Sequence, residues 1–293
     1  MAHAVLSHGS LRIRHINSST MKTRNTATVL LSAALLAGAL TNLRAQTAEP
    51  AAPAAPAEPA APAWAFVLTP SVATQYMFRG VRLGGLSLQP SLEADYGNFA
   101  VGIWASTPLS HKVPGQSDPE IDPYGSYTFT LAENLTLVPG FTFYTYPRAP
   151  LSNGFYHSTF EPSLALNYTV AGIKFTPKIY YDVVLNGPTY ELTVGYVVPL
   201  KELGTELDFT GVVGSYIWKD AVRNSDPKTK NWGDYYQIGV AAPFEINKQS
   251  KVTLGIAWVK GSNNYYKTGT DPRTQNTAAI GRGVATVSYI YSF

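Results

Sequence analysis

From Trp64 to Phe293, apolar and polar positions alternate along the chain with a period of two residues. Between Tyr190 and Leu200, aromatic and aliphatic residues hold every second position, and the intervening positions are mostly Glu, Thr, Gly and Pro. A period of two is typical of β-strands, whose successive side chains point to opposite faces. The pattern therefore predicts an all-β domain without long helices.

The alternating segments predict twelve strands, most of them 9 to 14 residues long. Soluble strands have about 5–6 residues, whereas a tilted strand needs ~9–11 to cross a bilayer. The second face of these strands is mostly small and polar, as expected for a barrel with lipid outside and water inside. The predicted strands span 66–79, 87–96, 99–107, 119–131, 134–146, 157–169, 172–185, 189–199, 205–218, 233–244, 251–261 and 281–293.

The connections between these strands alternate between long and short. One set comprises 80–86, 108–118, 147–156, 186–188, 219–232 and 262–280, of which only 186–188 is short. The other set comprises 97–98, 132–133, 170–171, 201–204 and 245–250. Outer-membrane barrels combine long extracellular loops with short periplasmic turns. We therefore expect a single antiparallel transmembrane β-barrel of about 12 strands, in the outer membrane, with both termini in the periplasm.

The N-terminal segment predicts export from the cytoplasm. Lys22 and Arg24 precede an apolar run of 12 residues, 29–40, and Ala45 offers a cleavage position, which is typical of a signal peptide. The run is too short to span a bilayer, which takes ~20 residues, and Met21 is the expected start. The predicted division is 1–45 for an upstream extension and signal peptide, 46–63 for an Ala/Pro-rich disordered spacer, and 64–293 for the barrel.

Composition narrows the chemistry further. The chain has no cysteine, which excludes disulfides, thiol catalysis and cysteine-bound metals. The net charge of +3 depends on five basic residues within 1–45; the remaining 17 basic residues face 19 acidic ones. Without clustered Lys and Arg, no nucleic-acid partner is expected. The acidic and amide residues of the loops match no calcium-binding spacing, so we expect neither a metal nor a cofactor.

Histidine placement argues against a hydrolase. Of the 5 histidines, three lie within 1–45, and His111 lies in an expected loop. His157 is followed by Ser158, but adjacent residues of a strand point to opposite faces and cannot form a Ser–His pair. We therefore expect that the protein is not an enzyme.

The face opposite the apolar one would line the lumen. It holds Arg79, Glu93, Asp95, Trp104, Glu120, Asp122, Glu161, Lys174, Lys178, Asp182, Glu191, Glu206, Asp208 and Arg282. This acidic excess predicts passage of cations or neutral polar solutes, because rings of charge set selectivity. Alternatively, the charges pair and fill the lumen, since twelve strands lie between filled eight-stranded barrels and open sixteen-stranded ones. Arg79 is expected to pair with Glu120 and Asp122, either as a structural network or as a constriction.

Aromatic residues fall near the expected strand ends, which predicts interfacial girdles. They include Trp64, Tyr76, Phe78, Tyr168, Tyr181, Tyr196, Trp218, Trp232, Trp258, Tyr289 and Phe293. The last residues, "ATVSYIYSF", are expected to form the closing strand and to pair with the first strand near 71–79. On that strand Tyr289, Tyr291 and Phe293 resemble the C-terminal signal recognised by the barrel-assembly machinery.

A stretch in the first half of the chain carries a family resemblance. Tyr76, Phe78, Arg79 and Gly80, then Pro90, Gly102 and Trp104, and finally Glu120, Ile121, Asp122, Tyr124 and Tyr127 resemble the TorF-type porin family of Gram-negative bacteria. The resemblance covers roughly residues 71–127 and implies an outer-membrane barrel with a pore role, without naming a solute.

Together these features predict a porin-like channel for passive diffusion of small polar solutes or ions. The alternative is a non-conducting structural or adhesive barrel that binds partners through its extracellular loops. The expected partners are outer-membrane lipid, the assembly machinery and small polar solutes.

Overall fold

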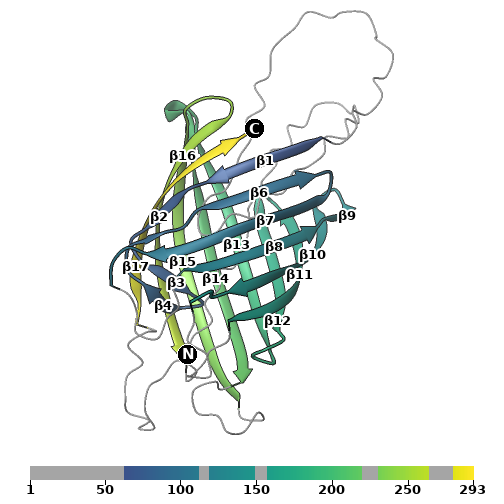
Figure 1. Ribbon diagram of the computed structural model, residues 1–293. Coiled ribbons are helices and arrows are strands. Elements are labelled where there is room, and N and C mark those ends of the chain that lie inside the picture. The colour runs from purple at the N-terminus through teal and green to yellow at the C-terminus, as the bar shows by residue number, and fades with distance from the viewer. Residues whose placement is uncertain (1–62, 112–118, 149–156, 220–229, 264–279) are drawn as a thin grey trace, which may run out of the picture.

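The computed structural model describes residues 63–111, 119–148, 157–219, 230–263 and 280–293. Within these ranges the chain forms an antiparallel β-barrel in which each wall strand is hydrogen-bonded to both neighbours (Figure 1). No helix of the described part is long and apolar enough to cross a membrane. The predicted signal peptide lies outside the described residues, as does nearly all of the Ala/Pro spacer.

In the described residues, twelve wall strands make up the barrel, as the alternation predicts, and three of them are interrupted. In ring order they are β1 (Trp64–Thr69) with β2 (Ser71–Ala73), β5 (Ser87–Leu88) with β6 (Ser91–Tyr96), β7 (Phe99–Pro108), β8 (Glu120–Tyr127) with β9 (Phe129–Ala132), β10 (Leu135–Thr145), β11 (Ser158–Val170), β12 (Ile173–Asp182), β13 (Gly187–Leu200), β14 (Thr205–Lys219), β15 (Lys230–Glu245), β16 (Ser250–Asn263) and β17 (Arg282–Ser292).

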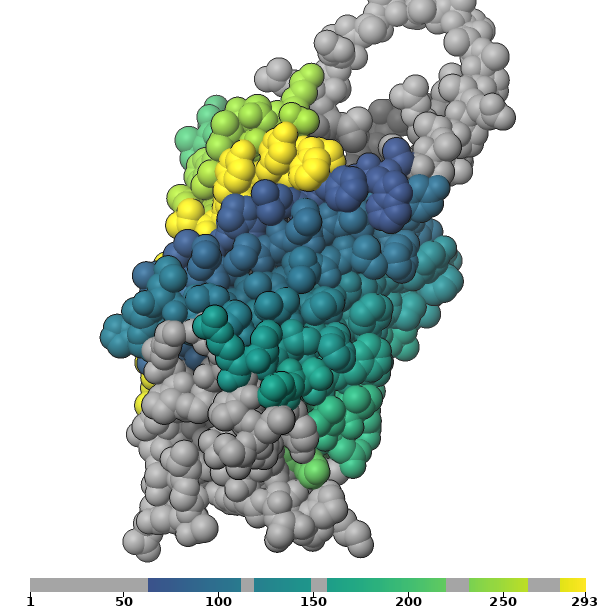
Figure 2. All heavy atoms as spheres, viewed as in Figure 1, coloured from purple at the N-terminus to yellow at the C-terminus, as the bar shows by residue number. Residues whose placement is uncertain are grey.

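The barrel closes where β17 meets β1 and β2. Val67 is paired with Ser292, and the backbones of Phe66 and Phe293 exchange hydrogen bonds of 2.9 and 3.0 Å. Further along, Ser71 is paired with Ser288. In Figure 2 the β17 side chains border those of the first strands along the wall. Closure is therefore confirmed and joins the two edges of the described sheet, although the pairing lies nearer residues 66–73 than 71–79.

The short connections of the sequence pattern are confirmed at one end of the barrel. Residues 97–98 join β6 to β7, residues 171–172 join β11 to β12, and a 3₁₀ turn at Lys201–Leu203 leads into β14. The remaining two are similarly short. At the opposite end, four expected long loops lie largely outside the described residues, at 112–118, 149–156, 220–229 and 264–279.

The outer surface of the barrel is apolar. Ile238, Ile256 and Val213 expose more than half of their surface, and many other large apolar side chains expose over a third. A soluble protein rarely leaves so large a contiguous apolar surface in water, and a lipid-facing wall requires one. Aromatic contacts occur near the short turns, where Trp64 lies 5.2 Å from Tyr96 between ring centroids. The wall is therefore that of a transmembrane barrel.

The first hairpin departs from the prediction. The chain leaves the wall after residue 74, and residues 75–85 turn into the lumen instead of completing a strand and an external loop (Figure 1). β3 (Tyr76–Phe78) and β4 (Val81–Gly84) form a separate two-stranded sheet, and neither pairs with a described wall strand. All three β3 side chains are at most 3% exposed, so they bury apolar surface inside the barrel instead of facing lipid. We call residues 76–84 the inner hairpin.

Candidate functional site

The turn of the inner hairpin consists of Arg79 and Gly80. Their φ angles are 43° and 78°, and both residues lie between the paired Phe78 and Val81. Two successive residues with positive φ are characteristic of a type I′ turn, which matches the twist of a tight hairpin. The turn places the Arg79 side chain at the tip of the hairpin, inside the barrel.

Apolar contacts hold the hairpin against the wall. The ring of Phe78 stacks on Trp218 of β14 at 6.1 Å, and Trp218 stacks on Tyr216 at 3.9 Å. Tyr76 packs at 5.7 Å against Trp104 of β7. Tyr76, Phe78 and Trp218 are thus buried in the lumen, so their predicted place in the interfacial girdles is wrong.

The hairpin tip also meets the wall backbone to backbone. A Cβ atom on Gly80 would lie 2.5 Å from the Cα of Gly261 on β16, and 2.7 Å from the carbonyl oxygen of Lys260. A Cβ on Gly261 would lie 2.7 Å from the carbonyl oxygen of Gly80. Two residues without side chains therefore allow this contact, for which any larger residue has no room.

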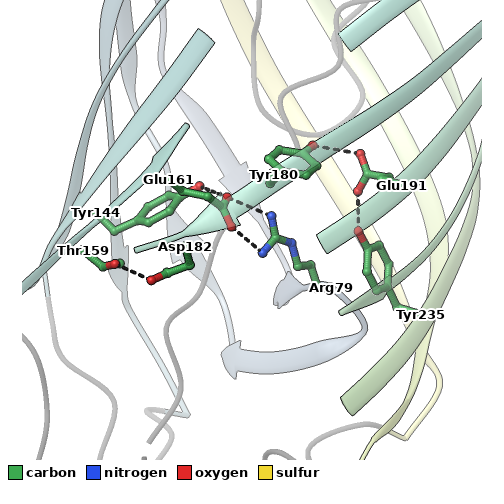
Figure 3. Close-up of polar contacts among 8 residues, drawn as sticks. All are labelled: Arg79, Tyr144, Thr159, Glu161, Tyr180, Asp182, Glu191 and Tyr235. Carbon is green, nitrogen blue, oxygen red and sulfur yellow. Dashed lines mark hydrogen bonds and ion pairs between the residues drawn. The ribbon is translucent and has the colours of Figure 1, made fainter. Parts of the chain in front are cut away.

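Arg79 reaches from this tip to β11. Its Nη1 and Nη2 donate to the two carboxylate oxygens of Glu161, each at 2.9 Å. The guanidinium carbon lies 4.7 Å from the ring centroid of Tyr180 (Figure 3). It lies 5.2 Å from the ring centroid of Trp218. Both charged side chains are 1% exposed. In ring order β16 and β11 are five strands apart, so the hairpin and Arg79 together bridge the lumen.

The prediction that Arg79 pairs with Glu120 and Asp122 is therefore wrong, because its ion-pair partner is Glu161. Glu120 of β8 instead accepts hydrogen bonds from the hydroxyls of Tyr76, at 2.7 Å, and Tyr146, at 3.0 Å. Asp122 lies two residues further on the same buried face. The sequence could not distinguish these carboxylates from Glu161, because all three share the lumen side of their strands.

A neighbouring network surrounds Glu191 on β13. Its carboxylate accepts hydrogen bonds from the hydroxyls of Tyr180, at 3.0 Å, and Tyr235, at 2.6 Å (Figure 3). The Lys178 ammonium lies 4.5 Å from the Tyr180 ring centroid. Asp182, at the end of β12, accepts from Thr159 at 2.6 Å and from two backbone amides of the following turn. Asp182 therefore fixes the β12–β13 connection.

Other lumen residues lie towards the short turns. Glu93 and Asp95 are buried near the end of β6, and Asp208 is buried near the start of β14. Lys174 is buried at the start of β12. Arg282, the first residue of β17, lies instead at the long-loop end and is half-buried. By contrast, the contacts of the inner hairpin at Glu161, Trp218 and Gly261 lie near the long-loop ends of their strands. Buried carboxylates thus lie in both halves of the lumen, and the inner hairpin occupies the half at the long loops.

Sequence reasoning missed the buried tyrosines that line the half of the lumen occupied by the inner hairpin. Tyr144, Tyr146, Tyr180, Tyr216 and Tyr235 are all at most 5% exposed. Strand parity could have found Tyr180, which shares a face with Lys178 and Asp182. The inner hairpin had a weaker signal, the Arg-Gly dipeptide between the apolar residues Phe78 and Val81.

Several residues of the family resemblance converge on this region, whereas Tyr127 is exposed on the outer wall. Tyr76 contacts both Trp104 and Glu120, and Phe78, Arg79 and Gly80 form the hairpin tip. A Cβ on Gly102 would collide with the Tyr124 ring, so this glycine leaves room for a lumen-facing tyrosine. Segments separated along the chain are therefore joined in one cluster.

Within the described ranges, no group of three or more His, Cys, Asp or Glu side chains could hold a metal ion.

Comparison with known proteins gives distant similarities. The KdgM porin is 13% identical, with 78% of this chain and 99% of that chain covered and a TM-score of 0.46. Omp33 of Acinetobacter baumannii is 8% identical, covers 78% and 98%, and has a TM-score of 0.39. OprD of Pseudomonas aeruginosa is 12% identical, covers 77% and 66%, and has a TM-score of 0.36. Similarity at this level fixes neither solute nor mechanism.

No curated protein matches the sequence. None of these similarities carries the TorF name, so that finer resemblance stays a prediction. A family model described as "Bacterial protein of unknown function (Gcw_chp)" matches residues 56–259, more than half of the chain, and the chain therefore belongs to this family.

Proposed function

We propose that the protein is a porin-like channel of the outer membrane that passes small polar solutes or ions through a mildly acidic lumen. The observation that carries the proposal is a charged interior enclosed by an apolar wall. In the described part of the chain, ten acidic or basic side chains are buried inside the barrel, among them Glu93, Asp95 and Asp208. Charge on the inner face is expected where water and solutes enter, and it sets which of them pass.

The short-turn half of the lumen supplies the proposed selectivity. Glu93 and Asp95 follow each other on the inner face of β6, and Asp208 and the half-buried Glu206 do so on β14. In the ring, β6 and β14 are well separated, so the acidic pairs lie on different parts of the wall. Carboxylates distributed around a narrow passage favour cations over anions.

The orientation is part of the proposal. The short turns would face the periplasm and the long connections the exterior, with both ends of the barrel on the periplasmic side. Residues 1–45 would direct export. The inner hairpin would then lie in the outward half of the lumen, where it restricts the passage before solutes reach Glu93, Asp95 and Asp208.

A second candidate is a non-conducting structural barrel. It is favoured by the inner hairpin itself, which contacts five wall strands, β7, β8, β11, β14 and β16, from inside the barrel. In this case the charges would serve only to satisfy one another.

Planar-bilayer recording of the purified mature protein separates the two. We expect stepwise conductance with preference for K⁺ over Cl⁻, and a smaller preference in the double variant Glu93→Gln/Asp95→Asn. The matched control is Glu202→Gln, because Glu202 is exposed in the 3₁₀ turn outside the barrel wall. Heat-dependent gel mobility would verify that each variant folds. Absence of conductance from folded protein would favour the structural barrel, and unchanged selectivity in the double variant would contradict the acidic filter.

A further inference from the structure

The side chain of Arg79 lies in the lumen like a bound ligand. It enters on the inner hairpin, which pairs with none of the described wall strands, and its guanidinium contacts wall residues of three different strands. Its backbone has a φ of 43°, in a type I′ turn that favours Asn, Asp or Gly. An arginine is an unfavourable choice for the turn, which indicates that the position is occupied for its guanidinium group.

The wall surface that receives this guanidinium is held in place by contacts of its own. Glu161 accepts a hydrogen bond from the Tyr144 hydroxyl at 2.9 Å, and the Tyr180 hydroxyl donates a hydrogen bond to Glu191. Trp218 stacks on Tyr216. None of these contacts involves the hairpin. A carboxylate held by the Tyr144 hydroxyl, together with the faces of Tyr180 and Trp218, matches a guanidinium, because that group is planar, donates to two carboxylate oxygens and stacks on rings.

Charge balance gives this surface an affinity of its own for cations. With Arg79 in place, the cations Arg79 and Lys178 face the carboxylates Glu161 and Glu191. Removing the guanidinium leaves a buried carboxylate without its ion-pair partner, which is strongly unfavourable. A soluble cation of matching shape would relieve this imbalance.

We propose that Glu161, Tyr144, Tyr180 and Trp218 form a guanidinium-binding site on the lumen wall, which Arg79 occupies in cis. Solutes that carry a guanidinium group are the class that binds this site when the Arg79 guanidinium does not occupy it. The transport of such solutes rests on the proposed function, but their binding does not.

The test removes the Arg79 guanidinium and supplies methylguanidinium in solution instead. Arg79→Asn removes the guanidinium and installs a residue that the type I′ turn prefers, so the hairpin itself is retained. We expect this variant to unfold at a lower temperature by heat-dependent gel mobility, and methylguanidinium at millimolar concentration to restore the midpoint in a saturable manner. Methylammonium has the same charge but lacks the planar group with two parallel N–H donors. We therefore expect its rescue of the unfolding midpoint to need a concentration at least about tenfold higher.

Two controls attribute the rescue to the site. Wild-type protein should gain little stability from methylguanidinium, because Arg79 already fills the site. In the double variant Arg79→Asn/Glu161→Gln, the apparent affinity for methylguanidinium should fall by about tenfold or more, because the two N–H donors no longer meet an ionised carboxylate. If Arg79→Asn does not refold alone, the refolding yield with methylguanidinium becomes the readout.

Equal rescue by both cations, or rescue that survives Glu161→Gln, would overturn the proposal, as would no rescue at all. Because the readout is stability, it does not depend on conduction. If methylguanidinium rescues the stability of the variant but the protein shows no conductance, the proposed channel function is refuted and the proposed binding site is supported.

Discussion

The contact between Gly80 and Gly261 offers a direct test of the inner hairpin. Replacing Gly80 with alanine adds one Cβ atom, 2.5 Å from the Gly261 Cα and 2.7 Å from its backbone nitrogen. Both neighbouring atoms belong to the backbone of β16, so no side-chain rotation can relieve the collision. The same substitution also imposes an unfavourable backbone conformation, since φ at residue 80 is +78°.

The two effects add to a measurable destabilisation. A non-glycine residue in the left-handed region costs about 1–2 kcal/mol. Inserting a methyl group into a tightly packed position typically costs about 1–3 kcal/mol. We therefore expect Gly80→Ala to lower the free energy of unfolding by about 2–5 kcal/mol, and the hairpin to shift away from β16 in the folded fraction.

Two matched variants separate strain from collision. Gly204→Ala carries the strain without a collision, because φ at residue 204 is +61° and no atom lies within 4 Å of the position that its Cβ would take. Gly261→Ala carries the reciprocal collision, 2.7 Å from the Gly80 carbonyl oxygen, without a positive φ. Thermal or denaturant unfolding in detergent would rank Gly80→Ala as the most destabilised, and bilayer recording would show larger conductance for both hairpin-contact variants than for Gly204→Ala.

The reasoning would be refuted if Gly80→Ala behaved like Gly204→Ala in both stability and conductance. That result would mean that the hairpin tip does not lie against β16. A destabilised variant without any gain in conductance would keep the contact but argue that the hairpin is not the obstruction in the lumen.

Two further predictions concern the wall. Ile256→Arg, at a side chain that is 62% exposed on β16, should destabilise the barrel in lipid by about 2–4 kcal/mol if this face lies near the bilayer centre, whereas Ile256→Leu should have little effect; equal refolding of both into vesicles would contradict lipid contact. Phe293→Ala should reduce assembly into the outer membrane far more than Phe244→Ala, because the predicted assembly signal includes only Phe293; both rings are exposed on the wall, so equal yields in the membrane fraction would refute that signal.

Strand number and the inside-outside division were predictable from sequence because each depends on a local pattern. A strand alternates faces with a period of two, so Lys174, Lys178 and Asp182 had to share a side once β12 was recognised. The short turns were equally local, as the positive-φ pair Ala171 and Gly172 between β11 and β12 illustrates. Closure followed from the need to leave no unpaired edge in a membrane.

The inner hairpin was not predictable, because its residues carry the same alternation as a wall strand. Tyr76 and Phe78 continue the pattern of β1 and β2, and only the space inside the barrel decides that they turn inward. There they pack on Trp104 and Trp218, which lie on β7 and β14. Contacts between such distant segments depend on the closed ring and leave no mark in the local pattern.

The amino-acid sequence by itself determined a twelve-stranded barrel with an apolar exterior and polar or charged residues on the inner face, since period, strand length and loop length are local properties. Only the tertiary structure decided that the lumen contains a hairpin and that Arg79 pairs with Glu161 instead of Glu120 or Asp122. The physical reason is that parity chooses a face for each residue, whereas pairing across a lumen depends on strand order, stagger and the depth at which each side chain lies.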